Sequence, residues 1–314
     1  MNEKQIFYRD MNGCRIPPVH IADAEPEEAL RETDELYAAA DTLSLLNAER
    51  HRRVLLALSA AATALTFAFL LYDEAEMHGL ILACGVMLVC MFLIRRMSDR
   101  LDCHRKYLQY RVLAECLRCR YFLSYAGIKT PITEILPWTV RKGIPWIADL
   151  LSSLPEGAAS EMRPVLDAWV RAQKAYHEEA LVKTQIKSRR DDRIAKTVRA
   201  VTVVVYMAAL VYELFLYGHA EAAGNADEIR AFLKILLGTM SAVALFTGSY
   251  YGKMSLSHVI DDHKRMTALF EKAEQDIRRE GESEEILLFL ARECMNENSA
   301  WYAYQSKNTA DISI

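Results

Sequence analysis

The stretch Val54–Tyr72, VLLALSAAATALTFAFLLY, decides the fold of this 314-residue chain. It runs for nineteen residues without a charged side chain. At a rise of ~1.5 Å per residue, a helix of this length is about as long as the hydrocarbon core of a bilayer is thick. The sequence therefore predicts a membrane-spanning helix here.

Three more apolar runs follow. Gly79–Ile94 holds sixteen uncharged residues after a connection of six, so it predicts the returning arm of a helical hairpin. Ala200–Tyr217 carries one carboxylate, Glu213, and Ile235–Tyr251 carries no charge. A buried helix of a soluble protein is the alternative for any single run, but four runs with consistent flanking charges favour a membrane protein. We predict an all-α membrane protein with two transmembrane hairpins, whose helices extend into a cytoplasmic helical bundle.

Charged residues are segregated from these runs. They make up 25% of the chain while the mean hydropathy is close to zero, which is unusual for a single soluble globule. The net charge of −4 says little about partners, because basic residues flank the runs and acidic ones mostly lie elsewhere. The first fifty residues are polar and lack the apolar core of a signal peptide, so we expect the first run to act as the insertion signal.

The charges beside the runs predict their orientation. Basic residues stand at one end of the first three runs: Arg50, Arg52, Arg53, Arg95, Arg96, Arg100, Lys187, Arg189, Arg190, Arg193, Lys196 and Arg199. Acidic residues stand in the connections at the opposite ends: Asp73, Glu74, Glu76, Glu221, Asp227 and Glu228. Because basic flanks stay on the cytoplasmic side, we expect a multi-pass protein of the inner membrane with both termini in the cytoplasm.

This orientation gives the predicted division of the chain. The segments are an N-terminal cytoplasmic segment (1–50), a first transmembrane hairpin (51–96), a cytoplasmic helical region (97–197), a second transmembrane hairpin (198–252) and C-terminal cytoplasmic helices (253–314).

Small residues four apart mark the faces on which membrane helices approach closely. Ala57 and Ala61 form such a pair in the first run, and Gly238 and Ala242 form another in the fourth. They favour packing within the four helices, with a seam between copies of the chain as the second interpretation.

Glu213 is the one ionisable residue inside a run. A carboxylate in hydrocarbon is costly unless it is protonated, paired or hydrated. Glu213 lies about one turn from the outer end of its run, so it either reaches to the interface or lines a water-filled pore or vestibule. Both interpretations stay open.

The stretch Met97–Ile128 has no proline and no glycine before Gly127, which predicts one long helix continuing out of the second run. Arg111, Glu115 and Arg118 follow one another at spacings of four and three, so their charges share a face of this helix. They form either a structural salt-bridge ladder or a ligand-binding face.

No catalytic constellation is recognisable. The sequence lacks a glycine-rich phosphate loop, a His-Glu-x-x-His motif and a nucleophile elbow, so we expect no enzyme, no catalytic residues and no cofactor. Cys103, His104, Cys116 and Cys119 lie on one helical pattern without a second pair of ligands, which favours small buried residues over a metal site. His177 lies in a charged helix, where a solvated or salt-bridged histidine is the favoured interpretation.

The region from Lys129 to Pro164 is the least regular. It contains five prolines together with Trp138 and Trp146. It either dips an amphipathic face into the inner headgroup layer or covers the cytoplasmic helices.

The segment Tyr110–Arg118, YRVLAECLR, resembles the Tyr-Arg-x-Leu-Ala-Glu-x-Leu-Arg pattern that follows a hairpin in the SLATT superfamily of bacterial membrane effectors. Gln173-x-x-Tyr176-His177 and the segment Glu293–Trp301 are similar to elements of its longer members, which have four transmembrane helices. The likeness covers residues ~45 to 305. Many long members also carry a nucleotide-binding domain at the front, where this chain has about fifty polar residues.

The resemblance implies an antiviral defence role of the abortive-infection kind. In such a system a nucleotide second messenger, or a nucleotide-sensing protein partner, triggers a membrane protein that oligomerises and permeabilises the cell's own inner membrane. Arg111, Glu115, Arg118 and His177 are then the candidate signal-receiving face, and Glu213 the candidate pore residue. The expected partners are the lipid bilayer, further copies of the chain and that trigger, with no nucleic acid.

Two other classes of function compete with this one. The main alternative is a passive membrane anchor or scaffold that recruits a soluble enzyme through the cytoplasmic bundle. A transporter ranks last. Its midplane site would need broken helices or buried ionisable groups, and the runs lack both.

Overall fold

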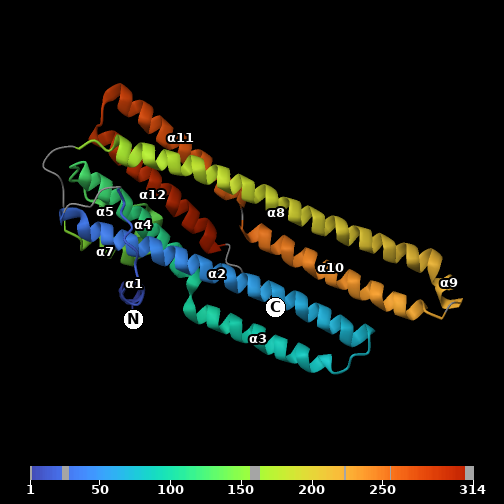
Figure 1. Ribbon diagram of the computed structural model, residues 1–314. Coiled ribbons are helices and arrows are strands. Elements are labelled where there is room, and N and C mark those ends of the chain that lie inside the picture. Colours follow the sequence, from blue (N-terminus) through green and yellow to red (C-terminus); the bar gives the residue numbers. More distant parts are fainter. Residues whose placement is uncertain (1, 23–27, 156–162, 223, 255, 308–314) are drawn as a thin grey trace. The chain divides into compact units, whose positions relative to one another are not determined.

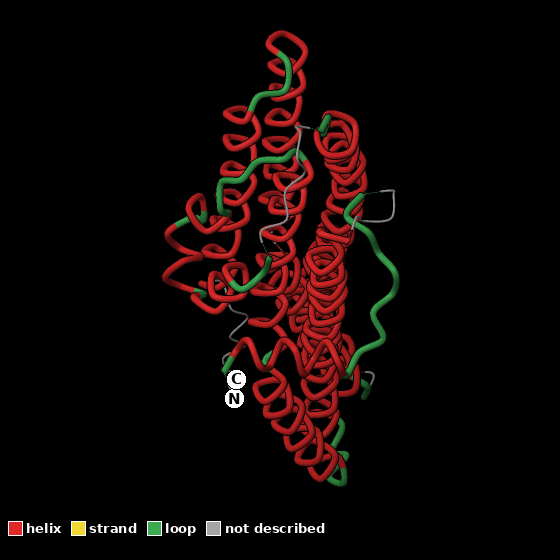
Figure 2. Tube along the Cα trace, turned by 90° about the vertical axis from the view of Figure 1, so that its left-hand side faces the viewer, coloured by secondary structure: helices red, strands yellow, loops and turns green. Residues whose placement is uncertain are grey.

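Helices and their connections make up residues 2–22, 28–155, 163–222, 224–254 and 256–307, which are the residues that the computed structural model describes. Over these ranges no strand occurs (Figures 1 and 2). In chain order the helices are α1 (Glu3–Asn12), α2 (Glu28–Glu74), α3 (Leu80–Leu101), α4 (Cys103–Tyr125), α5 (Ile132–Ile135), α6 (Trp138–Gly143), α7 (Pro145–Ser152), the π-helix η1 (Leu166–Arg171), α8 (Ala172–Val211), the π-helix η2 (Tyr212–Leu216), α9 (Tyr217–Ala222), α10 (Ala226–Met254), α11 (Leu256–Glu280) and α12 (Glu284–Lys307). The predicted all-α fold is confirmed.

The chain divides into two units, each of which is described by itself. The polar unit consists of Met1–Arg50, Asp102–Lys183 and His258–Ile314. The apolar unit consists of His51–Leu101 and Thr184–Ser257. Helices α2 and α8 each begin in the polar unit and end in the apolar one, because their residue ranges cross these bounds.

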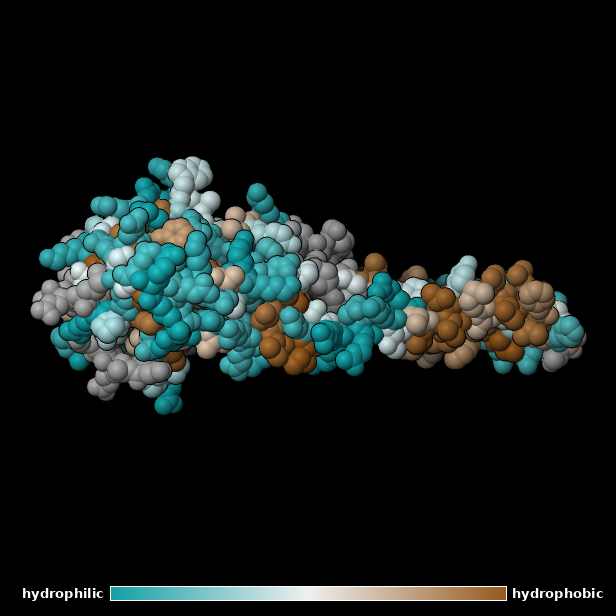
Figure 3. Space-filling model, turned by 90° about the horizontal axis from the view of Figure 1, so that it is seen from above, coloured by the Kyte–Doolittle hydropathy of each residue, from teal (hydrophilic) through white to brown (hydrophobic). Residues whose placement is uncertain are grey.

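The apolar unit holds the long apolar stretches. Four helical segments of the described chain are long and apolar enough to cross a membrane, which supports a multi-pass membrane protein. Their large side chains remain exposed, for example Leu82 at 76%, Val204 at 66% and Leu245 at 67%. Figure 3 shows the hydrophobic side chains gathered on these helices. Such surfaces are stable in contact with lipid tails, which replace water as their solvent.

Tight connections make the two hairpins of the apolar unit. Between α2 and α3 the backbone reverses at Glu76, whose φ of 53° is left-handed, and the His78 amide donates to the Glu76 carbonyl at 2.9 Å. Figure 1 shows α3 returning beside α2 and α10 returning beside α8. The predicted hairpins are confirmed.

Gly238 lets α10 approach α2 closely. A Cβ atom added at this position would lie 2.6 Å from Leu70 Cδ1 of α2, which is less than carbon atoms tolerate. A Cβ added at Gly248, further along α10, would meet nothing within 4 Å. The small residue Gly238 therefore packs against another helix of the apolar unit, as the first interpretation of the small residues expects.

The central helix of the polar unit is α4. Its buried residues, such as Leu113, Ala114, Cys116 and Leu117, lie on all sides of the helix. Trp169 of η1 stacks on Phe122 of α4 with ring centroids 5.2 Å apart, and Phe7 of α1 packs edge-on against Tyr110 at 5.4 Å. The amino-terminal residues therefore belong to the core of this unit.

The predicted single helix from Met97 to Ile128 is wrong, because it is divided at Asp102 and ends at Tyr125. The chain breaks between α3 and α4 at Asp102, whose φ of 50° and ψ of 38° are left-handed. Aspartate tolerates this conformation better than most residues because its short polar side chain bonds locally. Here the Asp102 carboxylate accepts a hydrogen bond from Arg105 Nε at 2.5 Å.

The proline- and tryptophan-rich region packs onto the core of the polar unit. Ile135 of α5, Val140 of α6, and Trp146 and Ile147 of α7 are buried, whereas Trp138 is 73% exposed. Residues 156–162 of this region lie outside the described residues. Of the two interpretations of this region, the described residues fit the second, because they cover the other helices of the polar unit.

Enlarging Gly238 should separate α10 from α2. We expect Gly238→Leu to lower the stability of the detergent-solubilised protein by about 1–3 kcal/mol, the usual cost of overpacking, measured as a lower midpoint of thermal unfolding. Gly248→Leu is the matched control and should leave the midpoint unchanged. Adding Leu70→Ala should restore part of the loss, and equal midpoints for both glycine variants would contradict the proposed contact.

Candidate functional site

Side chains from three helices of the polar unit meet at Arg118 of α4. Its Nη1 donates to Glu115 Oε2 at 2.7 Å, and each of these two side chains is only 11% exposed. Its Nη2 donates to the Tyr37 hydroxyl of α2 at 2.7 Å, and Nη1 also donates to Gln173 Oε1 of α8 at 3.4 Å. One guanidinium group thereby ties α2, α4 and α8 together.

A second ion pair joins α4 to α2. Arg111 Nη1 donates to Asp41 Oδ1 at 3.2 Å, and both side chains are largely buried. Burial and the nearby Arg118 act to lower the pKa of Arg111, but Tyr176, Glu115 and Asp41 hold it above its usual value. Arg111 is therefore charged at neutral pH and depends on the carboxylates around it.

A pair of histidines completes the group. Nδ1 of His177 in α8 and Nδ1 of His263 in α11 lie 3.1 Å apart, and the His177 ring stacks on Phe270. Burial, His263 and the arginines Arg118 and Arg111 lower the pKa of His177 to about 3. The pKa of His263 is also lowered, chiefly by burial. At neutral pH both rings are uncharged, so one nitrogen donates and the other accepts.

We name this group the charged cluster, and its members are Asp41, Arg111, Glu115, Arg118, His177 and His263. It contains all four residues that the sequence analysis proposed as a signal-receiving face. Ion pairs are present, as the interpretation of these charges as a salt-bridge ladder expects. A role of the four residues in receiving a signal stays a prediction. The interpretation of His177 as solvated or salt-bridged is wrong, because it is half-buried and bonded to another histidine.

The contribution of α2 to the charged cluster was not predicted from the sequence. Tyr37 and Asp41 lie in the segment interpreted as a polar amino-terminal region. A helical signal was available there, because Leu36, Ala39 and Leu43 follow at spacings of three and four and are all buried. The spacing predicts a helix that starts well before the first apolar run.

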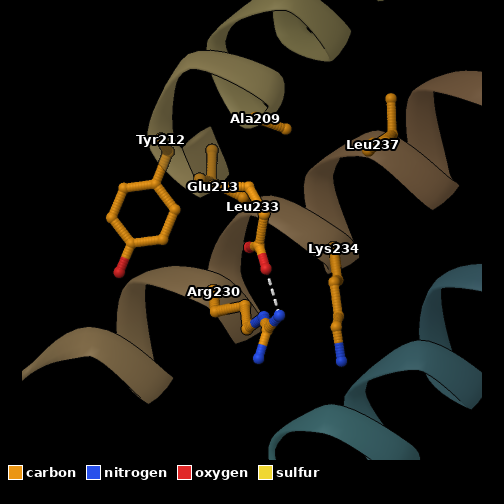
Figure 4. Close-up of a pocket in the computed structure, with 7 residues that line it drawn as sticks. All are labelled: Ala209, Tyr212, Glu213, Arg230, Leu233, Lys234 and Leu237. Atoms are coloured by element: carbon orange, nitrogen blue, oxygen red, sulfur yellow. Dashed lines mark hydrogen bonds and ion pairs between the residues drawn. The ribbon is translucent and has the colours of Figure 1, made fainter. Parts of the chain in front are cut away.

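Glu213 lies in the apolar unit and is paired. Its carboxylate contacts the guanidinium of Arg230 in α10, and Lys234 Nζ lies 3.0 Å from Glu74 Oε2 of α2. Figure 4 shows Glu213 pointing toward Arg230, with Lys234 extending from the next turn of α10. These side chains line a cavity of about 250 Å³ together with Ala209, Tyr212, Leu233 and Leu237. Pairing lowers the cost of a carboxylate in this setting.

The cavity residues Arg230 and Lys234 were also not predicted. They lie beside the acidic connection before the fourth run, where the acidic residues alone predicted the orientation. Glu213 itself belongs to the π-helix η2, and such bulges often lie at functional sites. Whether Glu213 lines a pore stays a prediction.

Three cysteines of α4 are buried, which disfavours their thiolate forms. Cys103, Cys116 and Cys119 are all at most 3% exposed, and burial raises the pKa of Cys103 and Cys116. His104 Nε2 lies 3.3 Å from the Gln305 carbonyl oxygen. Within the described ranges no group of three or more potential ligands is placed to hold a metal ion.

Compared with protein-family models, with the curated proteins and with the solved structures, the chain shows no match.

Acidification should destabilise the polar unit through His177. Its pKa is about 3 in the folded chain and ~6.5 in an unfolded chain, so the unfolded state binds more protons between these values. The neutral ring makes its full contribution to the free energy of unfolding above pH ~6.5. Below that pH the contribution falls by up to ~1.4 kcal/mol per pH unit.

Thermal unfolding of the detergent-solubilised protein at about pH 7.5 and about pH 5 measures this effect. His177→Gln should reduce the loss at the lower pH, because glutamine keeps a hydrogen-bond partner for His263 and does not titrate. His219→Gln is the control, since His219 is exposed on α9. An acid-induced loss of the same size in all three proteins would contradict the assignment to His177.

Proposed function

We propose that the chain is a triggered membrane effector of a bacterial antiviral defence system, which oligomerises and permeabilises the inner membrane when a signal reaches its polar unit. The polar unit then lies on the cytoplasmic side, as the basic residues beside the apolar runs predict. The resemblance of Tyr110–Arg118 to the SLATT superfamily supports this class of function. The trigger is a nucleotide second messenger or a protein partner that senses one.

One observation carries the proposal: the charged cluster is built on helices that run on into the apolar unit. Helix α2 holds both Asp41 and the whole of Val54–Tyr72. Helix α8 holds both His177 and most of the third apolar run. In this proposal a signal at the cluster acts on the apolar runs through these two helices, because each contains residues of both.

The chemistry of the cluster suits a switch. Its ion pairs are largely buried, so removing the partner of one charged side chain costs free energy. The arrangement of the helices that is most stable then changes. A phosphate group that competed with Asp41 for Arg111 would break the ion pair between α2 and α4, since guanidinium groups bind phosphate bidentately. In this proposal Glu213 becomes part of the vestibule of the assembled pore.

A passive anchor is the second candidate, and one observation favours it. Trp138 on α6 is 73% exposed in the polar unit, beside the basic residues Arg141 and Lys142. Exposed tryptophan is typical of residues that dominate protein–protein interfaces. A scaffold would use this surface to recruit a soluble enzyme and would leave the membrane intact.

Membrane integrity during infection separates the two candidates. Bacterial cells that express the chain are challenged with a panel of phages, and uptake of a membrane-impermeant dye is recorded with the membrane potential. An effector gives dye uptake and depolarisation that cells without the chain do not show at the same time after infection. A membrane that stays tight throughout, while the chain still protects the culture, would support the scaffold instead.

Neutralising one ion pair of the cluster tests the coupling. Asp41→Asn combined with Arg111→Gln removes both charges together and keeps hydrogen-bonding groups, so it should leave expression unchanged and reduce dye uptake about tenfold, a typical allosteric coupling. The control is Glu179→Gln with Lys183→Gln, which removes an exposed pair on α8 whose atoms lie 2.6 Å apart. Equal dye uptake for both double variants would contradict a role of the cluster in signalling.

A further inference from the structure

Four charged side chains lie at one end of the apolar unit, and they come from three helices. Glu74 ends α2, Glu213 lies in η2, and Arg230 and Lys234 lie on successive turns of α10. They form two ion pairs, Glu213 with Arg230 and Glu74 with Lys234. We propose that this group binds the headgroup of a phospholipid that carries a primary ammonium group, a phosphatidylethanolamine.

The phosphate of such a lipid would bind to α10. Arg230 and Lys234 are four residues apart, so they project from the same face of the helix. A guanidinium group has five N–H donors and an ammonium group has three, and each is engaged by one carboxylate in the described part of the chain. Their side chains are 41% and 52% exposed, which leaves donors open to a phosphate oxygen.

The depth of the group in the bilayer agrees with a headgroup. Glu213 lies four residues before the end of the third apolar run, and Lys234 directly precedes the fourth. Both positions are at the boundary between hydrocarbon and headgroups, where lipid phosphates lie. Tyr212 fixes this end of the hairpin, because its hydroxyl donates to the Ala226 carbonyl at 2.8 Å.

The cavity beside the ion pairs suits the start of an acyl chain. It has a volume of about 250 Å³, and Ala209, Leu233 and Leu237 provide apolar lining next to Glu213 and Arg230. Figure 4 shows the charged ends of Glu213, Arg230 and Lys234 gathered together, away from Ala209 and Leu237. A ligand with a charged head and an apolar tail therefore matches both parts of the cavity.

The balance of charges selects the headgroup. Two carboxylates and two cations give the group no net charge, so an anionic headgroup would meet Glu74 and Glu213 as well as the basic residues. A zwitterionic headgroup matches both signs. A primary ammonium group donates hydrogen bonds to the carboxylates, whereas the methylated ammonium of phosphatidylcholine has no N–H to donate.

The test uses the full chain in nanodiscs that contain equal parts of phosphatidylethanolamine, phosphatidylcholine and phosphatidylglycerol. Native mass spectrometry of the released protein counts the lipids that remain bound. We expect phosphatidylethanolamine to be enriched at least about fivefold over each of the other two lipids, as ion pairs and hydrogen bonds of this kind allow. No enrichment over phosphatidylcholine in the unmodified protein would overturn the proposal, whatever the variants do.

Paired substitutions assign the enrichment to this group. Glu213→Gln with Arg230→Gln keeps the local charge balance and should remove most of the enrichment, and Glu74→Gln with Lys234→Gln should act in the same way. Glu179→Gln with Lys183→Gln, in the polar unit, is the control and should keep it. Full enrichment in both cavity variants would overturn the assignment. The proposal rests on the membrane-spanning helices alone, so it stands or fails separately from pore formation.

Discussion

The structure depends on hydrocarbon acting as the solvent of four helical segments. Side chains such as Leu82, Val204 and Leu245 are mostly exposed, and this surface would be strongly unfavourable in water. In a lipid core every backbone group must find its partner within the chain, which only helices and closed barrels achieve. Helix α2 meets this requirement over the whole first apolar run, and α8 with the π-helix η2 meets it over most of the third.

Several charged side chains in both units are paired with a charge of the opposite sign. In the polar unit Arg118 pairs with Glu115 and Arg111 pairs with Asp41, and in the apolar unit Arg230 pairs with Glu213. A charge removed from water without a partner costs several kcal/mol. The two pairs that join different helices, Arg111 with Asp41 and Arg230 with Glu213, therefore help to fix which helices lie together. The same pairs are the places where a bound phosphate, a lipid headgroup or a change in protonation can alter the packing.

The sequence predicted best those structural features that depend on residues close together in the chain. An uncharged run of nineteen residues and the basic residues beside it predict spans and hairpins because length and hydropathy decide both. The break at Asp102 was missed because a left-handed residue has no strong signature without glycine. The pairing of Arg111 with Asp41 spans 70 residues of sequence, and that of Glu213 with Arg230 spans 17. Spacing along one helix cannot reveal such partners, so the charges of α4 were found but not what they bind.

Labelling from one side of the membrane tests the central claim most directly. In a chain with Cys14→Ser and Cys90→Ala, the two cysteines that are not buried, a single new cysteine is placed at Met77 or at Trp138. These positions are 50% and 73% exposed, one in the α2–α3 connection and one in the polar unit. A membrane-impermeant maleimide added to intact cells should label Met77→Cys, and it should label Trp138→Cys only after permeabilisation. Labelling of both positions in intact cells, or of neither, would contradict a chain that spans the membrane between them.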